Sequence, residues 1–254
     1  MLKFLGRGSA FNAKEGNTSA YYITNENNLL LFDCGSTVFQ KIQEKNLLKN
    51  KNRIIVFVTH THSDHIGSLS TLIEYCFYTL KRDIEVIYPD KEHIVNILNA
   101  LGVTPNMYNY HGSVSECDDN DIEKTFFIQT KHNDQITYLS FEVPHVDHFK
   151  SYAYIVYFKE NNTVVYYSCD ITAENFRNDY MLEALRLIDD GDKNVILYHD
   201  TCLADYEGNV HTPLRFLKEL IPEDKRKYVY CMHFDKDETI LKAKEDGFNV
   251  VEVE

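Results

Sequence analysis

In the segment Thr59-His60-Thr61-His62-Ser63-Asp64-His65-Ile66-Gly67-Ser68, three histidines and one aspartate fall within six positions. The apolar, β-branched run before it, residues 53–58, predicts a buried strand. Residues 69–80 after it carry Leu, Ile, Tyr and Phe at the spacing of a helix that packs with one face. We therefore expect four metal-binding side chains on a turn between a strand and a helix.

The spacing of these four residues suits a pair of metal ions. His60 and His62 are two apart in an extended segment, so their imidazoles leave the same side of the chain. Asp64 and His65 follow as the chain turns and can reach the same cavity from a second direction. Imidazole and carboxylate without a thiolate favour zinc, with manganese or iron as alternatives. A histidine-rich surface turn is the simpler interpretation, but four ligand-type residues placed after a strand and before Gly67 favour metal binding.

Composition narrows the class of substrate. The 254 residues are 44% hydrophobic and 26% charged, which is enough to build a substantial core. The 39 acidic and 26 basic residues give a formal net charge of -13, which argues against a long nucleic acid and favours a small substrate. Six cysteines without C-x-x-C spacing predict free, mostly buried thiols. With no secretory or membrane-spanning apolar run apparent, we expect a protein of the reducing cytoplasm.

Other predicted strands also end in polar residues. Several of them run into one or more of the residues Asp33, His145, Asp170, His199, Asp200 and His233. Side chains placed at successive strand ends meet at one edge of a sheet. This arrangement predicts a site at that edge.

The pattern His-x-His-x-Asp-His after a strand resembles the signature of the metallo-β-lactamase fold hydrolases. The resemblance implies an α/β (α+β) fold, an αββα sandwich of two mixed sheets flanked by helices. It also implies a two-metal site along one edge, within a single hydrolase domain over residues 1–254.

Further motifs resemble those of ribonuclease Z, a branch of this superfamily. His199-Asp200-Thr201 resembles its His-Glu-Ala-Thr motif with Asp in place of Glu, and His211-Thr212 resembles its later His-Ser-Thr. The run Cys231-Met232-His233-Phe234 resembles the segment of its final ligand. Asp33-Cys34-Gly35 resembles an early motif whose aspartate braces the ligand loop. The resemblance covers nearly the whole chain.

One departure narrows the family. Ribonuclease Z carries a long tRNA-gripping arm, but here a short hairpin through 160–162 is all that separates Tyr154 from Asp170. The chain is most similar to the arm-less phosphodiesterases known as phage anti-Pycsar proteins. That resemblance implies a zinc-dependent, homodimeric hydrolase in the cytoplasm of a bacterial host. It would convert 3′,5′-cyclic mononucleotides, particularly cyclic CMP and cyclic UMP, to 5′-monophosphates and so disarm a defence signal.

The resemblance also implies a set of ligands for two Zn²⁺, with Mn²⁺ as the alternative. Asp170 would bridge the two ions, Asp64 would serve as both ligand and catalytic residue, and His211 would be the general acid. His199 or Asp200 would orient His211, although both could instead form a buried pair without proton transfer. The ligands of the two ions would be His60, His62 and either His145 or His148 for one, and Asp64, His65 and His233 for the other.

Two histidines compete for one ligand position. The superfamily is expected to place a ligand histidine before a Ser-Tyr-Gly-Tyr-like strand, and this chain has Ser-Tyr-Ala-Tyr at 151–154. His145 lies at the end of the predicted strand 136–143, whereas His148 lies in a Val-Asp-His context like that of the family. One is expected to be a ligand and the other a pocket or structural residue.

Three other functions compete with the phosphodiesterase. They are a tRNA 3′-end endonuclease, another hydrolase of the superfamily such as a lactonase or thioesterase, and a nucleotide-binding sponge without turnover. The missing arm and the acidic charge disfavour the endonuclease. The motifs at 199 and 211 disfavour the other hydrolases, and the full ligand set disfavours the sponge. Elsewhere, we expect residues 103–124 to form a loop over the pocket or a partner and His93, His111 and His132 to be surface histidines.

Overall fold

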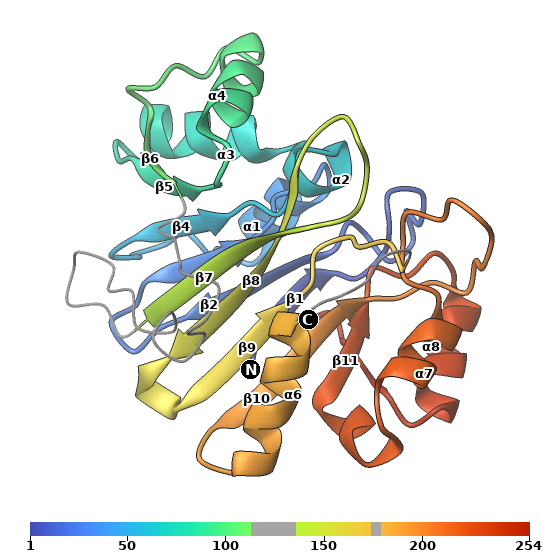
Figure 1. Ribbon diagram of the computed structural model, residues 1–254. Helices are drawn as coiled ribbons and strands as arrows, with labels where there is room; N and C mark the ends of the chain where they lie inside the picture. The colour runs from blue at the N-terminus through green and yellow to red at the C-terminus, as the bar shows by residue number, and fades with distance from the viewer. Residues whose placement is uncertain (113–135, 174–178) are drawn as a thin grey trace. The chain divides into compact units, whose positions relative to one another are not determined.

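The computed structural model describes residues 1–112, 136–173 and 179–254. The chain divides into two compact units, of which the first comprises Met1–Gly112 with Glu252–Glu254 and the second comprises Ser113–Val251. Each unit is built on its own six-stranded sheet (Figure 1). The single domain over residues 1–254 remains a prediction.

The first unit is a mixed sheet whose strands lie in sequence order, from β1 to β6. The first three strands pair antiparallel, and β4, β5 and β6 continue from β3 in parallel. Every residue of β3 and β4 is buried, as continuous apolar runs in parallel strands predict. The strands are β1 (Lys3–Gly6), β2 (Ser19–Ile23), β3 (Leu29–Phe32), β4 (Ile54–Phe57), β5 (Ile84–Ile87) and β6 (Tyr108–His111).

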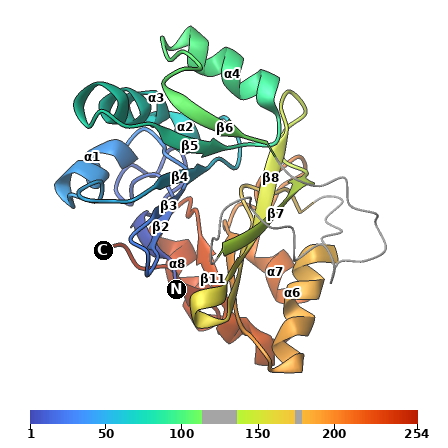
Figure 2. The same cartoon turned by 90° about the vertical axis from the view of Figure 1, so that its left-hand side faces the viewer.

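Helices connect the parallel strands of the first unit. α1 and α3 contact each other and lie side by side along the sheet (Figure 2). The helix predicted over 69–80 is present as α3, and its last turn is π-helical. The helices are α1 (Val38–Glu44), α2 (Ser63–Ile66), α3 (Leu69–Glu74), the π-turn η1 (Tyr75–Thr79) and α4 (Lys91–Ala100).

The second unit repeats this plan, with two antiparallel pairings followed by three parallel ones. Its strand order is β12-β11-β10-β9-β8-β7. The strands are β7 (Ile136–Val143), β8 (Ser151–Phe158), β9 (Thr163–Tyr167), β10 (Asn194–Asp200), β11 (Val229–Met232) and β12 (Asn249–Val250). The helices are α6 (Asp179–Asp190), α7 (Leu214–Leu220), α8 (Asp237–Glu245) and the 3-10 turns η2 (Lys159–Asn161) and η3 (Glu223–Tyr228).

One sequence-based expectation about the first unit is wrong. Residues 103–124 were expected to form a loop, but Tyr108–His111 form β6, which pairs in parallel with β5. Tyrosine favours strands even where a run is otherwise polar. The rest of the expected loop, from residue 113, lies outside the described residues, as does His132.

The cysteines of the described residues are free and buried, as their scattered spacing predicted. They are Cys34, Cys76, Cys169, Cys202 and Cys231. Cys117 lies outside the described residues. Across residues 1–112, 136–173 and 179–254, no helix has the length and apolarity needed to cross a membrane.

Candidate metal centre

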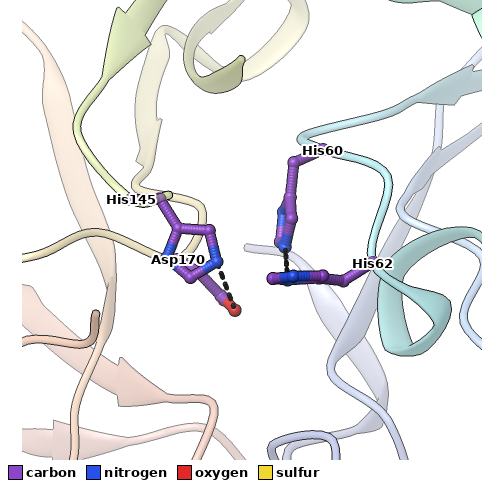
Figure 3. A group of neighbouring side chains, drawn as sticks. All are labelled: His60, His62, His145 and Asp170. Atoms are coloured by element: carbon purple, nitrogen blue, oxygen red, sulfur yellow. Dashed lines mark hydrogen bonds and ion pairs between the residues drawn. The ribbon is translucent and has the colours of Figure 1, made fainter. Parts of the chain in front are cut away.

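The predicted ligands fall into two groups, one in each unit. In the first unit, His60 follows β4 and His62 is the extended N-cap residue of α2. Their rings meet edge to face with centroids 4.9 Å apart, and Nε2 of His60 lies 3.0 Å from Nδ1 of His62 (Figure 3). The two imidazoles therefore converge, as the two-residue spacing predicted.

Asp33 braces the segment that carries these histidines. It is fully buried after β3, in a left-handed conformation with φ of 62°. Its Oδ1 accepts a hydrogen bond from the backbone N–H of Thr59, and its Oδ2 accepts one from the Thr59 hydroxyl, both at 2.8 Å. Oδ2 also lies 2.9 Å from Nδ1 of His65. Burial raises the pKa of the Asp33 carboxyl, and the neighbouring His65 and Thr59 oppose that shift.

The bond to Asp33 leaves the other nitrogen of His65 on the ligand side. Nε2 of His65 lies 3.3 Å from Oδ2 of Asp64, and both residues are buried. A carboxylate behind a histidine fixes the ring's orientation and raises its basicity as a ligand. The first unit thus brings together His60, His62, Asp64 and His65, all of them residues predicted to bind metal.

Close packing holds α2 against the loop after β3. A Cβ atom at Gly35 would overlap the carbonyl oxygen of Asp64, and one at Gly67 would overlap Ser36 and the Ser63 carbonyl oxygen. Glycine is required at both positions because backbone meets backbone there. The ligand turn is therefore seated directly on the Asp33 loop.

In the second unit, four predicted residues form one cluster of oxygen and nitrogen ligands. One ligand atom from each of the four lies within 4.8 Å of the others, and the residues are Asp170, Asp200, His211 and His233. Nε2 of His233 lies 3.4 Å from Oδ1 of Asp170. Imidazole and carboxylate donors in a buried cluster suit a divalent ion such as zinc or manganese.

Asp200 connects the loops that carry this cluster. Its Oδ2 accepts hydrogen bonds from the backbone N–H groups of Ile171 at 3.2 Å and Thr212 at 3.4 Å. The same oxygen lies 3.1 Å from Nδ1 of His211, and Oδ1 lies 3.4 Å from Nδ1 of His233. One fully buried carboxylate therefore hydrogen-bonds His211 and lies close to His233.

The electrostatics of this cluster favour a proton on His211. Burial by itself would lower the pKa of His211, but the carboxylates of Asp200 and Asp170 outweigh burial and the net shift is upward. Burial would likewise raise the pKa of Asp200, but His211 and His233 outweigh it and lower that pKa. Both shifts describe a cationic imidazole held by an anionic carboxylate.

The structure separates His145 from His148. His145 is buried, its Nδ1 lies 2.8 Å from the Val210 carbonyl oxygen, and its Nε2 lies 3.9 Å from Oδ2 of Asp170 (Figure 3). Burial lowers the pKa of His145, although Asp170 opposes the shift, and a neutral imidazole is the form that binds metal. His148 is exposed and packs edge to face on the ring of Phe149 at 4.6 Å.

His199 has a different environment from His211. It is fully buried, with Nδ1 2.8 Å from the carbonyl oxygen of Asp200 and its ring nearly parallel to that of Tyr166. Burial lowers its pKa. Of the two residues predicted to orient His211, the contact is made by Asp200.

Two hydroxyl residues of the site were missed from the sequence. Thr59 Oγ1 bonds Asp33 and also lies 3.1 Å from Nδ1 of His60. Ser168 Oγ accepts a hydrogen bond of 2.9 Å from the backbone N–H of Asp200. Thr59 directly precedes the predicted ligand His60, and Ser168 lies two positions before the predicted ligand Asp170. This closeness to predicted ligands is the signal that the sequence offers.

Two of the histidines expected at the surface, His93 and His111, contact residues outside the predicted ligands. Nε2 of His93 lies 2.8 Å from Thr61 Oγ1, and the exposed His111 lies 3.2 Å from Glu85. Among the residues that the structure describes, neither belongs to a group of ligand atoms.

Comparisons with known proteins identify the family. The family described as "Anti-Pycsar protein Apyc1" matches residues 1–253. The chain is 28% identical over 244 residues to the anti-Pycsar protein Apyc1 of Bacillus phage vB_BveM-Goe7, covering 92% of this chain and 88% of the phage protein. It is 32% identical over 114 residues to the ribonuclease Z of Methanosarcina acetivorans, covering 44% of this chain and 37% of that protein.

A solved structure establishes the fold. The metallo-β-lactamase fold protein YhfI from Bacillus subtilis matches with a TM-score of 0.68 at 14% identity, covering 100% of this chain and 95% of YhfI. This likeness confirms the predicted fold class of two mixed sheets flanked by helices. Because the family match extends over nearly every residue, the chain belongs to the anti-Pycsar protein Apyc1 family.

Proposed function

We propose that this protein is a zinc-dependent phosphodiesterase that hydrolyses 3′,5′-cyclic mononucleotides, including cyclic CMP and cyclic UMP, to 5′-monophosphates. In a phage-infected bacterium this activity would counter Pycsar signalling, as the family name implies. The observation that carries the proposal is the contact between His211 and Asp200, because it holds a proton-donating imidazole beside metal-binding residues. A homodimer in the host cytoplasm is part of the proposal.

The proposed metal site uses the predicted ligands, with His145 chosen over His148 because it is buried against Asp170. Two bound ions would supply a water of lowered pKa and positive charge for the phosphate oxygens. Mn²⁺ is the alternative metal. The ligands would be His60, His62 and His145 for one ion, Asp64, His65 and His233 for the other, and Asp170 for both.

His211 is proposed as the general acid. Hydrolysis adds a water oxygen to phosphorus and breaks the bond from phosphorus to the 3′ oxygen, which must gain a proton as it leaves. Nδ1 of His211 is hydrogen-bonded to Asp200, so Nε2 is the nitrogen that delivers this proton. General-acid catalysis of this kind contributes about 10²–10⁴-fold in rate. His199 is proposed as a structural residue, because its Nδ1 faces the Asp200 carbonyl oxygen and its ring stacks on Tyr166.

Charge and chain length favour a small substrate. The net charge of -13 disfavours a polyanion, and only the short connection 159–162 separates β8 from β9. The local identity to a ribonuclease Z nevertheless makes tRNA 3′-end cleavage the second candidate.

The test is turnover by purified, zinc-loaded protein. Cyclic CMP, UMP, AMP and GMP are assayed beside a pre-tRNA that carries a 3′ trailer, with His62→Ala as the metal-site control. We expect conversion of cyclic nucleotides to 5′-monophosphates and none in the variant. Cleavage of the pre-tRNA alone would replace the proposal with the endonuclease, and tight nucleotide binding without turnover would identify a sponge.

A further inference from the structure

A cavity of about 270 Å³ lies beside His211 within the second unit. It is formed mainly by the loop between β10 and α7 and by the first turn of α7. Pockets for whole drug-sized ligands have volumes of about 300–1,000 Å³. The size therefore suits one part of a nucleotide, and His211 in the wall places that part next to the proposed proton donor.

An exposed aromatic residue, Tyr206, lies on a hydrogen-bonded turn at this cavity. Tyr206 lines it with 62% of its surface exposed. The Tyr206 carbonyl oxygen accepts a hydrogen bond of 3.2 Å from the N–H of Asn209, across a turn in which Gly208 has φ of 79°. The buried Asn209 side chain donates to the Ala204 carbonyl oxygen at 2.7 Å and accepts from the N–H of His211 at 3.1 Å. One asparagine therefore shapes the Tyr206 turn and fixes the backbone of His211.

The cavity wall contains the guanidinium of Arg215, whose positive charge is balanced by two carboxylates. Arg215 Nε lies 2.7 Å from Asp205, and its Nη1 lies 2.8 Å from Glu219. With two carboxylates on one guanidinium, this wall has little attraction for a phosphate. The other lining groups include the rings of Tyr206 and Phe216 and the exposed carboxylate of Glu207. Such a surface suits a planar, uncharged group that carries an amino substituent.

We infer that this cavity binds the nucleobase of the cyclic nucleotide, with the base stacked on Tyr206. The inference rests on the proposed function, since it is His211 that places the ribose. The base and the 3′ oxygen are carried by the same sugar ring, so the base must lie close to the group that protonates that oxygen. Glu207 accepts a hydrogen bond from an exocyclic amino group, as acidic side chains do from cytosine. The site therefore prefers cytosine over uracil.

Kinetics of Tyr206→Ala test the stacking. Base–aromatic stacking is worth about 1–3 kcal/mol, which corresponds to a rise of about 5–150-fold in KM for cyclic CMP. kcat should stay within about twofold of the wild type, and Tyr206→Phe should restore KM. Tyr78→Ala is the matched control, because Tyr78 is 55% exposed in the first unit. A KM for Tyr206→Ala within about twofold of the wild type would overturn the inference.

A substrate without a base separates base recognition from general damage. The 3,5-cyclic phosphate of base-free ribose should be hydrolysed equally by the wild type and Tyr206→Ala. An equal loss on this substrate would show that Tyr206 does not act through the base. Glu207→Gln should lower the ratio of kcat/KM for cyclic CMP over cyclic UMP by about fivefold or more. An unchanged ratio would remove Glu207 from recognition.

Ligand-observed saturation-transfer NMR on metal-free protein tests binding without turnover. The base protons of cyclic CMP should receive strong saturation from the wild type and little from Tyr206→Ala. Should the zinc-loaded enzyme fail to hydrolyse any cyclic nucleotide, the proposed function fails, yet Tyr206-dependent saturation would still uphold the base site. Absence of saturation with wild-type protein would overturn the base site itself.

Discussion

Asp33 in the first unit and Asp200 in the second are both fully buried carboxylates, but they lie on different strands of equivalent sheets. Asp33 and Ser168 each follow the last residue of the third strand. Thr59 lies two residues past the end of β4 and Asp200 is the last residue of β10, but the strand register gives them matching positions. In the first unit the Asp33 carboxylate accepts from the Thr59 N–H at 2.8 Å. In the second the Ser168 hydroxyl accepts from the Asp200 N–H at 2.9 Å. In both units the residue after the third strand accepts this hydrogen bond, through a carboxylate in the first unit and through a hydroxyl in the second.

This exchange gives the two carboxylates different neighbours. Asp33 faces His65 and supports a predicted metal ligand from behind. Asp200 faces His211 as well as His233, and so also holds the proposed proton donor. A division of roles between the two carboxylates therefore follows from which strand each one terminates. The substitutions below test that division.

The largest effect is expected from Asp200→Asn. An amide cannot stabilise the cationic His211, so kcat for cyclic CMP should fall by about 10²–10⁴-fold. Steady-state kinetics at saturating zinc measures the loss, with metal content determined on the same sample. Asp192→Asn, at an exposed carboxylate of the same unit that lies outside the cavity beside His211, serves as the control. A kcat within about threefold of the wild type would remove proton transfer from the role of Asp200.

A smaller and different effect is expected from Asp33→Asn. Loss of the carboxylate behind a ligand histidine typically costs about 10–100-fold in metal affinity. kcat should recover once zinc is saturating, because the proton donor is untouched. Competition with a chromophoric chelator measures the affinity, and the exposed Asp83→Asn is the control. If kcat stays low at saturating zinc, the two carboxylates do not divide the work as described.

The stability of metal-free protein should depend on pH through His211. Its pKa is raised in the folded state above the unfolded value of about 6.5, so the ion pair with Asp200 stabilises fully below that value. The stabilisation disappears as pH rises through the folded pKa. The Tm of wild type should therefore exceed that of His211→Asn most at acidic pH, with the gap narrowing towards alkaline pH. A gap that widens with pH would refute the charged pair.

The smallest effect is expected at the cysteines, where the two units behave alike. Burial raises the pKa of Cys34 in the first unit and of Cys231 in the second to about 12. Thiolate is the reactive form, so both should resist iodoacetamide at pH 8 in folded protein and react after denaturation. Peptide mass spectrometry gives the extent of labelling. Rapid labelling of either folded thiol would contradict its burial.

Strands with strong local signals could be predicted from the sequence. β3 and β4 are short apolar runs bounded by turn residues, and the ligand turn after β4 has a specific spacing. β6 was missed because Tyr108-Asn109-Tyr110-His111 has no apolar run, and its pairing with β5 supplies what the local sequence lacks.

Two questions about the site could not be answered from the sequence, because each depends on a contact between residues far apart in the chain. His145 differs from His148 through the Val210 carbonyl oxygen, a residue 65 positions away. Asp200 differs from its neighbour His199 because its carboxylate contacts the His211 ring, eleven positions along the chain, whereas Nδ1 of His199 contacts the Asp200 carbonyl oxygen. No local pattern contains this information. Cysteine burial could be predicted because a free cysteine behaves as a small hydrophobic residue, and the convergence of His60 with His62 because it depends on near neighbours.

Three residues that follow strands have a left-handed backbone, and this limits how the thermal stability of the protein can be raised. Asp33, Cys169 and His233 have φ of 62°, 65° and 60°, a conformation that costs a non-glycine residue about 1–2 kcal/mol. Glycine would relieve this strain, but at position 33 it would also remove the carboxylate that accepts the two Thr59 hydrogen bonds. The same changes would remove the proposed ligand at 233 and would loosen the residue that leads into Asp170. A stabilised version of the protein has to gain its heat resistance elsewhere in the chain.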